Sequence, residues 1–424
     1  MILFLAKGLF RDRSRSLFPI LTVISGAFLT VLLISWIDGA FGTIIKSNAI
    51  YNSGHVKVMT RAYAEIPDQL PNDLVITNAP RLQRKLKKQY PDWNWLPRIK
   101  FGGLLDIPDK EGDTRVQGPV MGFGIDLFSK SSVEKKLLKL KKALVKGRLP
   151  RRSQEALISE NYAQKLGIKL GEQATLISST MYGGLAAYNF KIVGTVEFNI
   201  MALDKRTIVA DIRDLRIALD MPWGASEIIG LRKDMVFDNE QTKQLSAEYN
   251  KKYSNKKNEF SPKMLAMGEQ AGLGTWLELA GAMSVIMIGI FVLAMSLVLW
   301  NSGLMGALRR YGEIGLRLAM GEPKGAIYRS LIIESVIIGF VGSVLGTLLG
   351  LAAAFYLQEH GLDMRLVFRD TTTIMDNIMR ARITPACYYL GFIPGLLASV
   401  LGTVFAGIGI YKRQTAQLFK ELEV

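Results

Sequence analysis

Apolar residues are concentrated near the two ends of the chain, and most polar residues lie between them. The pattern predicts four membrane-spanning helices, at 17–37, 277–300, 331–357 and 386–411, because each segment reaches the ~20 residues that a helix needs to cross a bilayer. The apolar runs 17–37, 280–300, 331–357 and 386–410 carry a single charge, Glu334, near the cytoplasmic start of the third span. It is either a structural anchor or a residue with a proton or gating role. One span therefore precedes a long polar segment, and three follow it.

The segment 38–276 is long enough to fold around its own core, in one or two lobes. Short alternating runs at 56–58 and 190–196 indicate strands, with Phe190, Ile192 and Val196 on one face of the second. The segment is predicted to be an α+β domain, since helical patterns occur between the strands.

Two helical patterns are legible in this domain. Asn78 is a plausible N-cap for a helix over 80–90, which Pro91 ends. A second amphipathic helix is predicted over 133–144, where leucines recur on one face and lysines line the other. The lysine face either contacts anionic lipid headgroups or is a solvated surface over a small core.

Composition supports a membrane protein and excludes other classes. The 424 residues carry 53 Lys and Arg against 37 Asp and Glu, a net charge of +16, yet 49% are hydrophobic, only 21% are charged, and the mean hydropathy is +0.20. Such a chain is not disordered. A nucleic-acid partner is not expected, because the basic charge is not accompanied by a nucleic-acid-binding motif.

Catalysis and metal binding within the chain are not expected. Cys387, His55 and His360 are too few for a Cys/His zinc site or a histidine-based triad. No Gly-x-x-x-x-Gly-Lys-Ser/Thr loop occurs, so ATP and Mg²⁺ are expected on a separate ATPase chain.

Lys and Arg in the short flanks predict the orientation of the spans. Basic residues exceed acidic ones in the elbow helix 1–16, the connector 301–330 and the tail 412–424, which places these segments in the cytoplasm. The 38–276 domain and the loop 358–385 then lie on the outer side.

The connector 301–330 carries a charged ridge. Arg309, Glu313 and Arg317 recur every four residues, so they share one face of a helix, and Glu313 before Arg317 is the favoured order for an ion pair. Gly321 and Pro323 are predicted to end this helix. By itself the segment also fits a membrane-surface amphipathic helix.

Small residues form stripes in the last two spans. Spacing of four lets helix backbones approach closely, and packing is a main driving force inside lipid. We therefore predict helix contacts at Gly342, Gly346, Gly350, Gly395 and Gly402.

A hairpin is predicted around 178–189, with a Gly-Gly turn between two strands. Its tip is unusually apolar, which indicates either a partner or a loop folded back on the domain. The candidate contact residues are Met181, Tyr182, Leu185 and Tyr188.

The connector motif Arg-x-x-x-Glu-Ile-Gly-Leu-Arg-x-Ala-x-Gly, at 309–321, closely resembles the FtsX-like permease family of ABC transporters. The one-plus-three layout of spans is similar to that of the family. The motifs at 53–58, 147–150 and 163–172 resemble the lipoprotein-releasing (LolC/LolE) and MacB-type branch. Gly312 is a departure, since many members have a basic residue there.

The resemblance implies an α-helical membrane protein with an outer α+β domain of the MacB periplasmic type, in the cytoplasmic (inner) membrane. Two such permeases, identical or different, form a pair, and membrane lipids surround them. Each permease docks its connector helix on a cytoplasmic ABC ATPase. ATP-driven closure of the ATPases then moves the periplasmic domains, as in mechanotransmission. The residues that the resemblance assigns to coupling are Arg309, Arg310, Glu313, Ile314, Gly315, Arg317 and Gly321.

Lipoprotein release from the membrane is the leading function that the resemblance implies, with a periplasmic carrier as a further partner. The hairpin is shorter than its counterpart in lipoprotein-releasing permeases and lacks the proline-bounded pattern. Two alternatives stay open: an efflux permease that works with a periplasmic adaptor, and a non-transporting regulator of a cell-wall hydrolase.

Overall fold

The computed structural model describes residues 13–412 except 131, 271–272, 309–310 and 365–377. The chain divides into two compact units. One contains residues 1–42, 279–362 and 379–424, and the other contains residues 43–278 and 363–378. Each unit is described by itself.

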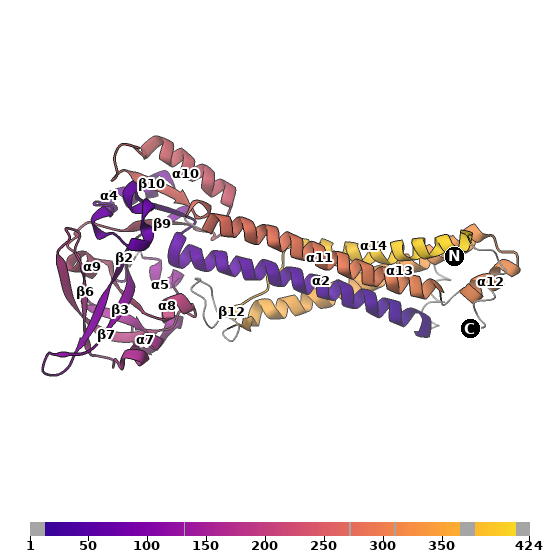
Figure 1. The fold of residues 1–424 in the computed structure, drawn as a ribbon, viewed down its shortest axis with the longest axis horizontal. Helices are drawn as coiled ribbons and strands as arrows, with labels where there is room; N and C mark the ends of the chain where they lie inside the picture. The colour runs from indigo at the N-terminus through magenta and orange to yellow at the C-terminus, as the bar shows by residue number, and fades with distance from the viewer. Residues whose placement is uncertain (1–12, 131, 271–272, 309–310, 365–377, 413–424) are drawn as a thin grey trace. The chain divides into compact units, whose positions relative to one another are not determined.

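The first unit is built from long apolar helices, as predicted (Figure 1). Within the described residues, four helices are long and apolar enough to cross a membrane, with mean hydropathies from 1.6 to 2.5 in their most apolar windows. One is N-terminal and three are C-terminal. They are α2 (Arg13–Asn48), α11 (Leu273–Leu308), α13 (Lys324–His360) and α14 (Pro385–Lys412).

The helices extend beyond the apolar spans that the sequence predicted. Residues 13–16, assigned to a separate elbow helix, are continuous with α2, and α11 continues to Leu308 rather than ending at 300. Hydropathy marks only the apolar part of a helix, whereas its backbone hydrogen bonds continue until the chain turns. Glu334 lies well inside α13 and not at its N-terminus, so a helix dipole that acts over the first turn does not explain it.

The second unit is an α+β domain, which confirms the predicted class. A ten-stranded sheet runs in the order β10-β1-β9-β2-β3-β8-β5-β7-β4, and β6 pairs with both β2 and β7. Its strands are β1 (Val56–Thr60), β2 (Trp93–Pro108), β3 (Thr114–Ile125), β4 (Leu144–Gly147), β5 (Glu155–Ser159), β6 (Gln173–Ser179), β7 (Leu185–Val196), β8 (Thr207–Asp211), β9 (Glu227–Arg232) and β10 (Pro262–Ala266).

Helices cover these strands, and short helical turns connect them. A π-helical turn, Ala49–Ser53, precedes β1. The α-helices are α3 (Arg61–Glu65), α4 (Ala79–Gln89), α5 (Glu134–Leu137), α6 (Leu140–Ala143), α7 (Glu160–Leu166), α8 (Met201–Asp204), α9 (Ile212–Ala218) and α10 (Asn239–Tyr253). Single 3-10 turns lie at Pro67–Gln69, Asn72–Leu74 and Met267–Glu269.

The long strand β2 joins two lobes of the domain. Its first part, Trp93–Arg98, pairs with β9, and β9 continues through β1 to β10. From Ile99 onward it pairs with β3, and Leu104–Asp106 also pair with β6. The pairings β2-β3-β8-β5-β7-β6 return to β2, so six strands close a ring around the main apolar core.

Two local sequence patterns in the domain predicted its structure correctly. The run 190–196 lies in β7, with Phe190, Ile192 and Val196 fully buried. Asn78 caps α4, since its side chain accepts the backbone N–H of Arg81 at 3.1 Å. Both features depend on neighbours in sequence, which is why periodicity and capping rules found them.

The predicted helix over 133–144 is wrong. The segment is divided into the short helices α5 and α6 and strand β4, and the backbone of Lys139 between the helices is left-handed, with φ +49°. Leu138 and Leu140 are both fully buried. One continuous helix does not direct positions two residues apart into the same core, so the helix breaks at Lys139.

Candidate functional sites

The connector is not one helix. α11 extends through its first part, the nine-residue α12 (Tyr311–Ala319) follows, and α13 begins at Lys324. Arg309 and Arg310 lie outside the described residues. Glu313 and Ile314 are in α12, but their side chains lie outside the described part of the structure.

Gly321 ends α12, as predicted. Its φ is +89°, a left-handed conformation that glycine adopts without a steric penalty. The Glu322 N–H donates to Arg317 O at 3.1 Å and the Gly321 N–H donates to Leu318 O at 3.0 Å, the bond pair of a Schellman motif. Gly315 is buried within α12, so the connector packs at this position.

Arg317 pairs with Glu322, whereas the helical spacing predicted Glu313 as its partner. Its Nε and Nη2 donate to the Glu322 carboxylate at 2.8 and 3.2 Å, and both side chains are about one third exposed. The chain reversal at Gly321 returns Glu322 to the end of α12. An acid next to a predicted helix-ending glycine was the signal that could have found this pair.

The glycines of α13 lie against the first apolar helix of the same chain. A Cβ on Gly342 would lie 2.7 Å from Val23 Cβ, and one on Gly346 would lie 2.5 Å from the backbone oxygen of Ile24. Gly350 has the same relation to Val31, at 2.8 Å. The stripe therefore packs α13 on α2 at backbone distance.

The glycines of α14 lie against two other helices. A Cβ on Gly395 would meet Ser343 Oγ of α13 at 2.5 Å, and one on Gly402 would meet the Trp300 backbone oxygen of α11 at 2.9 Å. All five glycines singled out in the sequence thus lie at close approaches within this unit.

The hairpin between β6 and β7 is partly folded onto the domain. The Met181 N–H donates to Leu219 O at 2.8 Å, and Met181 and Tyr188 pack against the main core. Tyr182 and Leu185, in contrast, are 76% and 82% exposed. The structure therefore reduces the four predicted contact residues to two with accessible side chains.

Changing Tyr182 and Leu185 together to Ser is expected to leave the melting temperature unchanged, because neither side chain is buried. If this pair is a docking surface, transfer of substrate to a periplasmic acceptor is lost in reconstituted vesicles while ATP hydrolysis persists. Normal transfer by the double variant excludes the docking role. Met181→Ser is the matched comparison, and a lower melting temperature is expected because Met181 packs on the core.

Buried charges at the junction of the lobes were not predicted. Arg98 of β2 donates to Glu134 of α5 through Nε and Nη2 at 2.9 and 2.8 Å, and its Nη1 donates to Ile50 O at 2.7 Å. Arg98 and Glu134 are each 1% exposed. Burial opposes the charge of Arg98, but the Glu134 carboxylate outweighs it and raises the pKa of Arg98. The pair fastens β2, α5 and the turn Ala49–Ser53 to one another.

A second buried group lies on neighbouring strands. Glu227 of β9 accepts ion pairs from Lys57 of β1 at 2.9 Å and from Lys100 of β2 at 3.2 Å. Burial raises the pKa of Glu227, but Lys100 and Lys57 outweigh it, and the pKa lies below its ordinary value. Burial lowers the pKa of Lys100 to about 8 despite Glu227. One carboxylate thus binds both ammonium groups inside the domain, and Lys100 also donates to Asn52 Oδ1 at 2.8 Å, so we interpret this cluster as structural.

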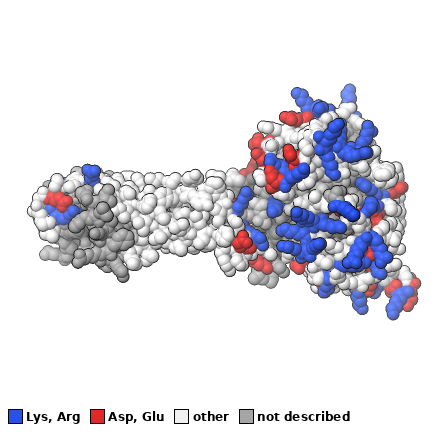
Figure 2. Space-filling model, turned by 180° about the vertical axis from the view of Figure 1, so that it is seen from behind, with Lys and Arg blue, Asp and Glu red and all other residues white. Residues whose placement is uncertain are grey.

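Cations dominate the surface of the domain that Figure 2 shows, whereas the surface of the apolar helices is almost uncharged. This distribution fits the charge segregation seen along the sequence. The positive surface charge favours binding of anionic ligands in exposed clefts of the domain.

Comparisons with known proteins bear on the helical unit most directly. Residues 285–415 match the family model described as FtsX-like permease C-terminal. The macrolide export ATP-binding/permease protein MacB 1/2 of Paracoccus denitrificans (strain Pd 1222) is 29% identical over 123 residues, which are 27% of this chain and 18% of that protein. The match thus spans less than a fifth of the relative's length.

Among solved structures, the periplasmic region of MacB from Actinobacillus actinomycetemcomitans is similar to 54% of this chain and 97% of that one. The identity is 11% and the TM-score is 0.34. This similarity establishes neither a shared activity nor a shared partner.

Proposed function

We propose that the chain is the transmembrane permease subunit of a mechanotransmission-type ABC transporter, because residues 285–415 match the FtsX-like permease family model. The family match carries the proposal, and the four long apolar helices, with an α+β domain between the first and the second in the sequence, support it. The permease domain is a membrane-spanning part of such transporters and is not their catalytic part.

The proposed partners follow from this role. A separate cytoplasmic ABC ATPase binds ATP and Mg²⁺ and docks on α12, and a second permease, identical or different, completes the pair. The Lys and Arg excess in the connector supports a cytoplasmic α12 and a periplasmic domain 43–278. The chain then belongs in the cytoplasmic membrane, with both termini inside.

Lipoprotein release is the substrate function that we favour. Its support is the likeness of the 53–58, 147–150 and 163–172 motifs to the lipoprotein-releasing branch, together with the exposed Tyr182 and Leu185. The efflux alternative is supported by the MacB relative, whose name describes macrolide export. Regulation of a cell-wall hydrolase is the third candidate.

Purification of the intact complex, followed by mass spectrometry of what copurifies, separates these functions. Acylated proteins are the expected result for lipoprotein release. A periplasmic adaptor without acylated protein would favour efflux, and a hydrolase would favour the regulator. Copurification of no ATPase chain would contradict the permease assignment itself.

We expect Glu313→Arg to uncouple ATP hydrolysis from transport or to release the ATPase. Removing one partner of a desolvated interfacial charge pair costs roughly 2–5 kcal/mol, whereas a surface pair within one helix contributes about 0.2–0.5 kcal/mol. Retention of the ATPase on the detergent-solubilised complex, and transport by reconstituted vesicles, are the measurements.

The matched control is Glu359→Arg, which makes the same charge change at the opposite end of α13 from the connector. It is expected to retain both the ATPase and transport. If Glu313→Arg behaves like this control, α12 has no role in coupling and returns to a passive membrane-surface helix.

A further inference from the structure

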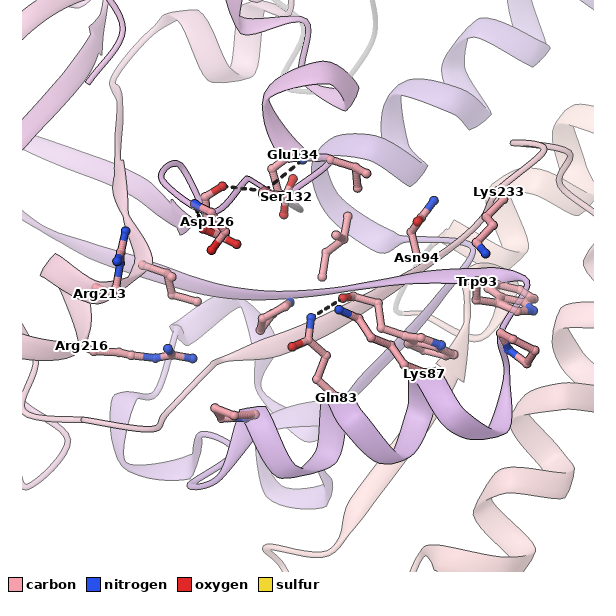
Figure 3. Close-up of a pocket in the computed structure, with 18 residues that line it drawn as sticks. Gln83, Lys87, Trp93, Asn94, Asp126, Ser132, Glu134, Arg213, Arg216 and Lys233 are labelled. Atoms are coloured by element: carbon pink, nitrogen blue, oxygen red, sulfur yellow. Dashed lines mark hydrogen bonds between the residues drawn. The ribbon is translucent and has the colours of Figure 1, made fainter. Parts of the chain in front are cut away.

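A cleft of about 460 Å³ lies between the two lobes of the domain, where β2 passes from one sheet into the strand ring (Figure 3). One wall is formed by α4 and residues 93–97 of β2. The other is formed by Asp126, Ser129, Ser132 and Val133, by Glu134 at the start of α5, and by α9. Its volume falls within the ~300–1,000 Å³ typical of pockets for small organic ligands, and such pockets occur preferentially between lobes.

The cleft is lined by an excess of cations. Lys87 of α4, Lys233 after β9, and Arg213 and Arg216 of α9 all line it. Arg213 is paired with Asp211 at 2.9 Å. Lys87 and Lys233 form no ion pair within the described part of the chain, and Arg216 donates its Nε to Gly224 O at 2.9 Å rather than to a carboxylate.

The acids of the cleft do not balance these cations. Glu134 lines the cleft but is already neutralised by the buried Arg98. Asp126 is the remaining acid of the lining, and its Oδ1 accepts the Ser129 N–H at 3.0 Å. Burial lowers the pKa of Arg216 even with Asp211 and Asp126 nearby, and Arg216 forms no ion pair within the residues that the structure describes.

The cleft also has an apolar and aromatic part of its lining. Trp93, Pro97 and Val133 are partly exposed there, and Trp93 stacks on the buried Trp95 with ring centroids 5.9 Å apart. Figure 3 shows Arg213 and Arg216 at one end, Lys233 at the other, and Lys87 between them. Positive charge at both ends of an apolar surface complements an elongated molecule with a negative group at each end.

We propose that this cleft is a binding site for an elongated organic dianion with an apolar or aromatic body. One anionic group lies at Arg213 and Arg216 and the other at Lys233, and Lys87 adds positive charge between the two ends. The cleft lies wholly within residues 43–278, so ligand binding there does not require an ATPase or a partner permease.

The probe is 2,6-naphthalenedicarboxylate, which carries two carboxylates on a rigid aromatic body. The full chain in phosphatidylcholine nanodiscs, without ATPase, is titrated by calorimetry. The expected result is saturable binding of the dicarboxylate, with no binding of its neutral dimethyl ester, because the ester lacks the charges that pair with the cations.

Lys87→Glu and Lys233→Glu are each expected to weaken binding of the dianion at least about tenfold, because each replaces a positive charge of the lining by a negative one. Lys88→Glu is the matched control: it makes the same change at the next position of α4, on an exposed residue that does not line the cleft. Its dissociation constant is expected to equal that of the unmodified chain.

Several outcomes would overturn the proposal. These are no binding of the dicarboxylate at millimolar concentration, equal binding of the dimethyl ester, or equal loss of affinity in the Lys87→Glu and Lys88→Glu variants. Each of them leaves the permease assignment standing, since that assignment is tested by copurification of an ATPase.

Discussion

Gly346→Leu is expected to force α13 away from α2 and to destabilise the helical unit. Even a Cβ at this position would lie 2.5 Å from the backbone oxygen of Ile24 and 2.7 Å from Ala27 Cβ, and a backbone atom cannot move aside as a flexible side chain can. Overpacking of this kind typically costs about 1–3 kcal/mol and occasionally more. The loss is expected at the upper end, because separation at Gly346 also breaks the contacts at Gly342 and Gly350.

The measurement is the melting temperature of the detergent-solubilised chain, followed by retention of the ATPase. Gly289→Leu in α11 is the matched control, since a Cβ there meets nothing within 4 Å. It is expected to melt like the unmodified chain. Equal melting temperatures for the two variants would show that α2 and α13 do not pack through the glycine stripe.

Arg98→Met is expected to destabilise the domain by about 3–5 kcal/mol, because it leaves the Glu134 carboxylate charged and unpaired in the interior. It also removes the donor to Ile50 O, so amide hydrogen exchange should increase in the turn Ala49–Ser53. Urea unfolding of the full chain followed by circular dichroism, together with hydrogen exchange, measures both effects.

Arg115→Met provides the surface comparison. Arg115 and Glu172 are 2.8 Å apart, with side chains about one third exposed, and pairs of this kind contribute about 0.2–1 kcal/mol. The double variant Arg98→Met with Glu134→Leu is expected to recover much of the loss, because no charge remains buried without a partner. If Arg98→Met costs no more than Arg115→Met, the buried pair does not hold the lobes together.

Much of the fold could be predicted from the sequence, because the patterns that indicate it involve residues close together in the chain. Each long apolar run is a property of consecutive residues, and so are the alternation at 190–196, the cap at Asn78 and the helix end at Gly321. The spacing of Gly342, Gly346 and Gly350 predicted a packing face as well. It could not identify the partner helix, since α2 lies more than three hundred residues earlier in the chain.

The parts that the sequence analysis missed depend on distant residues. Arg98 and Glu134 are 36 positions apart, and the walls of the cleft come from four separate segments. The helix breaks at Lys139 because both Leu138 and Leu140 are buried in the core. Burial of these two side chains stabilises the broken form more than the helical pattern of 133–144 stabilises one helix. Arg317 selects Glu322 because the chain reverses between them.

The sequence by itself determined which segments are apolar enough to enter a membrane, that an α+β domain lies between them, and where backbones approach closely. These properties follow from side-chain polarity and size at neighbouring positions. Only the tertiary structure decided how β2 joins the two lobes, which charges are neutralised inside the domain, and which cations are left to line the cleft. Electrostatic compensation depends on distances in space, and the strand pairings that bring these charges together are set by the packing of the whole core.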